Sequence, residues 1–266
     1  MPLSRLLAAS GLALILSGCI NSGTLIRVKP DGSGTIEQTV LMNVAALKSL
    51  MSGLDAQGQP KTGSPFNEAD LKRTAERMGK GVRFVSSTPL KDGAFEGAKA
   101  IFAFDDINLL QIEQDPNLGS SGGPMSMAAK KPSPVKFKLA REGATSNLTI
   151  TFDENAARQA APPNAQAGPE LDPAMLNMMK VMFQGFKVAI DLEVDGKIVK
   201  TNADYVNGSR ITLLEIDMAA LLEDEAKLRA LQGKLGPGSS IADVKPFLKD
   251  VKGVKINHSV VNIEYR

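Results

Sequence analysis

The sequence is poor in the residues from which thiol and histidine sites are built. Its 266 residues include one cysteine, one histidine and no tryptophan. A single cysteine cannot form an intramolecular disulfide, a multi-thiolate zinc site or an iron–sulfur cluster. A single histidine, His258, excludes sites that need several imidazole ligands. Disulfide frameworks and multi-histidine metal sites are therefore outside what this chain can assemble.

The chain also lacks an excess of charge of one sign. There are 31 basic and 29 acidic side chains, which gives a formal net charge of +2. A nearly neutral chain has no broad electrostatic attraction for a polyanion, so we expect no nucleic-acid partner. Hydrophobic residues make up 43% and charged residues 23% of the sequence, which is typical of a globular protein. Because aromatic residues are few, aliphatic side chains and eleven methionines must fill the core.

The first nineteen residues are typical of an export signal. Arg5 is followed by an apolar run, Leu6–Leu16, and the only cysteine, Cys19, comes shortly after it. This is the layout of a secretory signal peptide, and the run is too short to remain as a membrane-spanning helix. An ordinary signal peptide that contains Cys19 by chance is the alternative interpretation.

The stretch Leu16-Ser17-Gly18-Cys19 matches the bacterial lipobox, so the chain resembles a lipoprotein precursor. The resemblance implies cleavage by the signal peptidase between Gly18 and Cys19. It also implies that Cys19 carries an S-diacylglycerol group and an N-palmitoyl group. Each buried CH₂ of these chains contributes about 0.8 kcal/mol, so several acyl chains anchor a protein firmly.

The same resemblance implies a location. An Asp after the lipidated cysteine commonly retains lipoproteins in the inner membrane of Gram-negative cells, and here that position is Ile20. We therefore expect an extracytoplasmic, lipid-anchored protein, which in a Gram-negative cell would lie in the outer membrane, facing the periplasm. No apolar run after Cys19 is long enough to span a bilayer, so we expect membrane contact through the covalent lipid anchor.

Alternating apolar and polar runs predict several β-hairpins after Cys19. The runs Thr24–Pro30 and Thr35–Met42 flank an Asp-Gly-Ser-Gly turn, and Val188–Val194 precedes Asp195-Gly196. We expect residues 1–18 to be the signal peptide and residues 19–266 to form a single extracytoplasmic domain. Three stretches rich in Gly, Pro, Ala, Ser and Gln are expected to be flexible, near 56–66, 115–134 and 156–172.

Several segments predict helices. Asn67 and Asp70 form a capping-box-like pair, and Asp217 is placed to cap a helix through about Gln232. Hairpins imply antiparallel pairing, so the sequence predicts an α+β fold in which four to five helices pack on one face of a hairpin-rich antiparallel sheet. A methionine-rich helix over 173–186 either fills the core or lines a cavity for an apolar ligand.

No motif in the chain predicts catalysis. Asp105, Asp106 and Asn108 lack the spacing and the glycine of a calcium loop. His258 and Ser259 are adjacent on a predicted strand, so their side chains point to opposite faces. Asp191 and Glu193 would share a strand face, as charges on any solvated sheet do. We therefore expect no catalytic residue, no cofactor-binding residue and no metal site.

The segment Cys19–Asn43 resembles the start of uncharacterised bacterial lipoproteins, among them the LppM-type lipoproteins of mycobacteria. These proteins place a strand, a tight Gly-containing turn and a second strand directly after the lipobox. The later hairpin with its GKIVKTNA run, residues 196–203, also resembles the LppM type. The resemblance implies an extracytoplasmic lipoprotein domain of unknown activity. LppM-type proteins carry a C-terminal membrane helix, whereas residues 20–266 of this sequence contain no apolar run long enough for one.

From these observations we expect a non-enzymatic, lipid-anchored envelope protein that binds a protein partner or an envelope component. One alternative is a carrier that holds an apolar ligand or a lipid between helices and sheet. A second alternative is an envelope enzyme that uses carboxylates.

Overall fold

The computed structural model describes five continuous segments and four single positions. The segments are residues 20–43, 67–112, 135–152, 185–227 and 241–266, and the positions are Leu176, Asn177, Lys180 and Phe183. The predicted signal peptide, the lipid-attachment residue Cys19 and the three predicted flexible stretches lie outside the described residues. So does most of the predicted methionine-rich helix.

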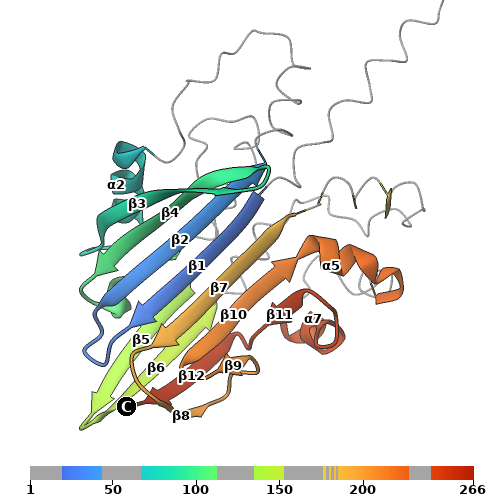
Figure 1. Cartoon of the computed structure of the whole chain (residues 1–266). Helices are drawn as coiled ribbons and strands as arrows, with labels where there is room; N and C mark the ends of the chain where they lie inside the picture. The colour runs from blue at the N-terminus through green and yellow to red at the C-terminus, as the bar shows by residue number, and fades with distance from the viewer. Residues whose placement is uncertain are drawn as a thin grey trace, which may run out of the picture.

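The described strands form two sheets (Figure 1). The large sheet has the order β11-β10-β7-β1-β2-β4-β3, with β9 paired to β10, and the small sheet has the order β5-β6-β12-β8. The strands of the large sheet are β1 (Ile20–Val28), β2 (Gly34–Asn43), β3 (Arg83–Asp92), β4 (Phe95–Phe104), β7 (Lys187–Val194), β9 (Val206–Asn207), β10 (Arg210–Asp217) and β11 (Val254–Ile256). Those of the small sheet are β5 (Val135–Glu142), β6 (Thr145–Phe152), β8 (Ile198–Thr201) and β12 (Val260–Tyr265).

The prediction of an α+β fold with helices covering one sheet face is wrong. A second sheet, and not a helical layer, packs on the large sheet, so the described residues form a β-sandwich (Figure 1). The described helices are short and lie toward the ends of the sheets. They are α2 (Glu68–Arg77), the 3₁₀ helix η2 (Ile107–Leu109), α5 (Met218–Glu223) and α7 (Ile241–Leu248).

The large sheet is also not purely antiparallel, because β1 and β7 run parallel in register from Asn21↔Lys187 to Val28↔Val194. Parallel neighbours need a long connection between them, and here β2 to β6 all lie between β1 and β7 in the chain. A hairpin joins strands that follow each other in the sequence. Hairpin patterns therefore give no sign of the parallel pairing between the distant strands β1 and β7.

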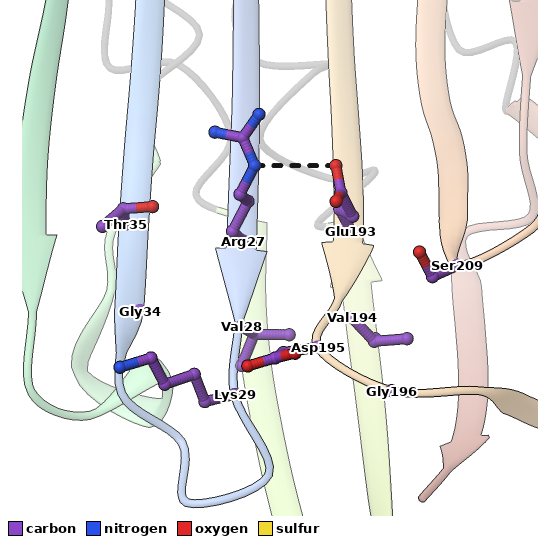
Figure 2. Close-up of a pocket in the computed structure, with 10 residues that line it drawn as sticks. All are labelled: Arg27, Val28, Lys29, Gly34, Thr35, Glu193, Val194, Asp195, Gly196 and Ser209. Atoms are coloured by element: carbon purple, nitrogen blue, oxygen red, sulfur yellow. Dashed lines mark ion pairs between the residues drawn. The ribbon is translucent and has the colours of Figure 1, made fainter.

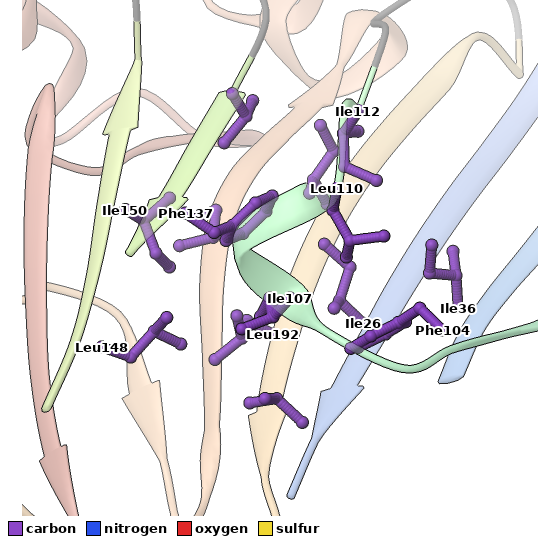
Figure 3. Close-up of a cluster of buried hydrophobic side chains, with 14 of the residues drawn as sticks. Ile26, Ile36, Phe104, Ile107, Leu110, Ile112, Phe137, Leu148, Ile150 and Leu192 are labelled. Carbon is purple, nitrogen blue, oxygen red and sulfur yellow. The ribbon is translucent and has the colours of Figure 1, made fainter. Parts of the chain in front are cut away.

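The main core lies between the two sheets and is closed by η2 (Figure 3). Ile26 and Leu192 of the large sheet and Ile150 of the small sheet are each 0% exposed. Ile107 of η2 is equally buried, because its backbone N–H donates to Gly32 O at 2.8 Å and holds the segment against the β1–β2 turn. Burial of this kind contributes about 1.5–3 kcal/mol for each large aliphatic side chain.

A second, smaller core forms where α5 and α7 pack beside β11. Its members come from these helices, from the segments next to them and from residue 176: Leu176, Leu221, Leu222, Leu248, Val251 and Val254. Pro246 lies inside α7. Leu222 of α5 is fully buried in this second core. These helices therefore cover one end of the large sheet and leave most of its face to the small sheet.

Two local predictions are confirmed. The N-terminal hairpin forms with Ile26 opposite Ile36, and the Asp31 carboxylate accepts hydrogen bonds from Ser33 N at 2.9 Å and Ser33 Oγ at 2.7 Å in its turn. The side chain of Asn67 caps α2 by accepting from Asp70 N at 2.9 Å.

One turn was placed wrongly. Pro89 and Gly93 in the sequence predict a turn over Pro89–Gly93, whereas β3 continues to Asp92 and Pro89 pairs opposite Ala98. Proline is tolerated there because β3 is an edge strand, where one side of the backbone needs no strand partner.

Candidate functional site

The first described residue, Ile20, is also the first residue of β1, a central strand of the large sheet. β1 is bonded to β7 on one side and to β2 on the other. The predicted lipid-attachment residue Cys19 therefore directly precedes the sheet, with no spacer in the sequence.

The large sheet has two ends, which we define by the direction of β1. The near end is where β1 and β7 begin and β2 and β10 finish, and the far end is where β1 and β7 finish. β1 contains nine residues. At about 3.3 Å per residue, the two ends are roughly 30 Å apart.

A shallow pocket lies at the far end, on the face of the large sheet that points away from the small sheet (Figure 2). Its volume is about 300 Å³, at the lower limit for small-molecule sites. The residues that line it are Arg27, Val28, Lys29, Gly34, Thr35, Glu193, Val194, Asp195, Gly196 and Ser209. Because Ile26 and Val28 are buried in the core, the side chain of Arg27 between them points to the opposite, outer face.

Backbone hydrogen bonds hold the three walls of the pocket together. Asp195 N donates to Val28 O at 2.8 Å, which joins the end of β7 to the end of β1. Val194 N donates to Ser209 O at 3.0 Å, which joins β7 to the segment before β10. The walls are therefore strand ends and the turns next to them, tied to one another by backbone hydrogen bonds.

Two cationic and two anionic side chains line this pocket, and they are partly paired. Arg27 Nε lies 3.6 Å from Glu193 Oε2, and Arg27 Nη1 lies 3.3 Å from Glu37 Oε2 on β2. Lys29 and Asp195 are exposed on the rim. Such a lining suits a small polar or zwitterionic group, because it offers donors and acceptors at short range and no net charge of either sign.

The ion pairs continue over the outer face of the large sheet. Asp191, which shares this face with Glu193 as the sequence indicated, accepts from Arg210 Nη2 and Thr212 Oγ1 at 2.7 Å each. Burial is the largest single influence on the Glu215 carboxyl and would raise its pKa. Lys255 and Lys187 together outweigh it, so this pKa lies below its usual value. These carboxylates are thus neutralised across neighbouring strands.

His258 belongs to a different cluster, which sequence reasoning missed. Its Nε2 atom lies 3.5 Å from Asp204 Oδ1, and the buried Lys245 Nζ of α7 forms an ion pair with Asp204 Oδ2 at 2.5 Å. Asn257 is 2% exposed, accepts from Asp204 N at 2.9 Å and donates to Thr212 O at 2.7 Å. This cluster therefore joins α7 to the sheet.

The charge balance of this cluster favours the ionised carboxylate. The Lys245 ammonium group holds the pKa of the Asp204 carboxyl below its usual value, against the opposite effect of burial, and His258 and Lys249 add smaller contributions. Asp204 lies far from His258 in sequence and in a segment without a recognisable pattern, so no local spacing could have revealed the contact.

The acidic turn after β4 has a structural role. Asp106 Oδ1 caps η2 by accepting from Asn108 N at 2.9 Å, and Asp105 pairs with Arg83 at 2.6 Å. Within the described segments, no three His, Cys, Asp or Glu side chains are grouped so that they could hold a metal ion. None of the helices described combines the length and the apolar character that a bilayer crossing requires.

Comparisons with known proteins give one weak structural likeness. No protein-family model matches the chain, and the search of curated proteins found no match. Among solved structures, the folded domain of the Mycobacterium tuberculosis LppM protein, determined by NMR, aligns with 96% of this chain and 94% of its own length. The identity is 11% and the TM-score 0.35, values too low to transfer a fold or an activity to this chain.

Proposed function

We propose that this protein is a lipid-anchored, extracytoplasmic envelope protein that binds an envelope component or a partner protein and catalyses no reaction. In a Gram-negative cell its location would be the outer membrane, facing the periplasm. The observation that carries the proposal is the start of β1 at Ile20, directly after the lipobox cysteine Cys19. A folded body that begins at the anchored residue is held at the membrane surface.

The pocket at the far end supports a binding role. It lies roughly 30 Å from the anchored end of β1, so a partner in the periplasm could reach it. Its walls are strand ends and adjoining turns that backbone hydrogen bonds tie together, which favours a rigid surface. A rigid polar surface lowers the ordering cost of association, which favours recognition of a partner.

The arrangement of the acidic side chains supports a non-enzymatic role. Asp191, Glu193 and Glu215 each pair with a cation on a neighbouring strand. A general acid or base needs a carboxyl group whose pKa is moved toward the working pH, whereas the pKa values of Asp204 and Glu215 are lowered. These groups are suited to holding strands and α7 together.

The anchor is tested by labelling cells with radioactive palmitate. Wild-type protein should incorporate label and fractionate with membranes, and Cys19→Ala should do neither. Equal labelling of the two proteins would contradict the proposal.

The binding role is tested by photo-crosslinking in intact cells. A photoreactive residue placed at Lys29 on the pocket rim should form one dominant adduct. The same residue at Lys136, on the exposed face of the small sheet, is the matched control. Equal adducts from both sites would contradict a role of the pocket. A lipid that co-purifies in native mass spectrometry would favour the carrier alternative instead.

A further inference from the structure

The two ends of the large sheet differ in the chemistry of their side chains. At the near end, strand register places Met42 opposite Ile20 and Asn43 opposite Phe95. The same end carries Phe186, just before β7, and Met218, the first residue of α5, and Met218 N donates to Phe186 O at 3.0 Å.

The large apolar side chains at the near end are partly exposed. This holds for Met42, Phe95, Phe186 and Met218, which come from four separate parts of the chain. The turns next to β1 at the far end are different. Residues 29–33 and 195–197 contain only charged, small or proline residues. The near end thus combines partly exposed large apolar side chains with charged ones, such as Lys91 and Glu96 of the β3–β4 hairpin, whereas the far-end turns next to β1 contain no large apolar residue.

We propose that the near end of the large sheet rests on the bilayer surface, with Met42, Phe95, Phe186 and Met218 in the headgroup region. The inference depends on the proposed lipid anchor at Cys19. Consecutive Cα atoms are about 3.8 Å apart, so Ile20 cannot leave the surface once Cys19 is acylated. The β1 backbone is bonded on both sides, so its neighbours approach the bilayer with it.

Partly exposed phenylalanine and methionine side chains are suited to this position. Aromatic and aliphatic side chains at a membrane surface bury apolar area between the headgroups, while nearby charges stay in water. Lys187 and Asp217 face each other in register at the same rim and supply such charges. The outer face with its pocket then stands upright, with the far end directed away from the membrane.

The absence of tryptophan from the sequence permits a direct test. Phe95→Trp places a single tryptophan, which can be excited selectively, at the near end. Val199→Trp places one at the far end, on β8, where Val199 is 50% exposed. The neighbouring Ile198 pairs with Tyr265, whose hydroxyl donates to Lys29 O at 3.1 Å, so this part of β8 lies beside the end of β1.

Each variant is purified as the full lipidated protein and reconstituted into vesicles of phosphatidylethanolamine and phosphatidylglycerol, with or without brominated acyl chains. The expected result for Phe95→Trp is a blue-shifted emission that brominated lipid quenches. The emission of Val199→Trp should be the same in both kinds of vesicle. The double variant Cys19→Ala, Phe95→Trp should stay in solution unquenched.

The outcomes separate the two proposals. Vesicle-bound protein in which Phe95→Trp is unquenched, or quenched no more than Val199→Trp, would overturn the bilayer contact and leave the anchor intact. A second copy or a partner protein covering the near end would give this result. Failure of palmitate to label Cys19 would overturn the anchor itself, and the bilayer contact with it.

Discussion

The packing of the small sheet on the large one predicts very unequal losses of stability for substitutions at two neighbouring residues of β6. Ile150 is 0% exposed and faces the large sheet, whereas Thr151 points to the other face and is only partly buried. Ile150→Ala removes buried methyl and methylene groups and leaves a cavity, which costs about 2–5 kcal/mol. Thr151→Ala removes side-chain atoms at a solvated face and should change stability by no more than about 0.5 kcal/mol.

Thermal unfolding followed by far-UV circular dichroism measures the difference, because the protein has no tryptophan to report by fluorescence. In a chain of this length, each kcal/mol corresponds to about 2–4 °C, so Ile150→Ala should unfold about 4–20 °C below the wild type. Thr151→Ala should unfold within about 2 °C of it. Equal effects of the two substitutions would refute the face-to-face packing of the two sheets.

The cluster that joins α7 to the sheet gives two further predictions. Because the folded-state pKa of Asp204 is lowered, its pair with Lys245 stabilises the protein above the ordinary Asp pKa, near 3.8, and this contribution is lost as the pH falls through the lowered value. The free energy of unfolding of Asp204→Asn, measured by urea titration, should therefore be lower than that of wild type at neutral pH and equal to it in acid. A difference that is the same at every pH would contradict the pairing. Asn257→Ala should cost about 1–3 kcal/mol in the same titrations, because it removes a buried amide that donates to the Thr212 carbonyl and accepts from Asp204 N. Asn147→Ala, on the outer face of β6, is the control, and an equal loss there would contradict this role of Asn257.

Local features of the fold could be predicted from the sequence because they depend on residues close together in the chain. The Asp31 turn and the Asn67 cap are examples, since a side chain bonds to a backbone group two or three positions away. The division into two sheets could not be predicted in this way. The strands β6 and β12 alternate just as β2 does, and alternation shows that one face is buried but not which sheet covers it.

In the candidate sites, too, only the features that depend on residues close together in the chain could be predicted. The shared face of Asp191 and Glu193 follows from strand periodicity, but their partners Arg210 and Arg27 depend on strand order. The contact between Asp204 and His258 depends on where α7 and the C-terminal strands pack. Pairing across strands is a property of the tertiary fold, and one sequence contains no signal for it.

The central position of β1 has a mechanical consequence. In a chain anchored at Cys19, any tension between the membrane and a bound partner enters the fold along β1. Its hydrogen bonds to the two neighbouring strands run across that direction on both sides. The pairing with β2 extends over Ile20–Val28 and the pairing with β7 over Asn21–Val28. Such a pull loads the bonds together in shear, whereas an edge strand would be peeled away one bond at a time. The anchored strand is thus in the position from which force can extract it least easily.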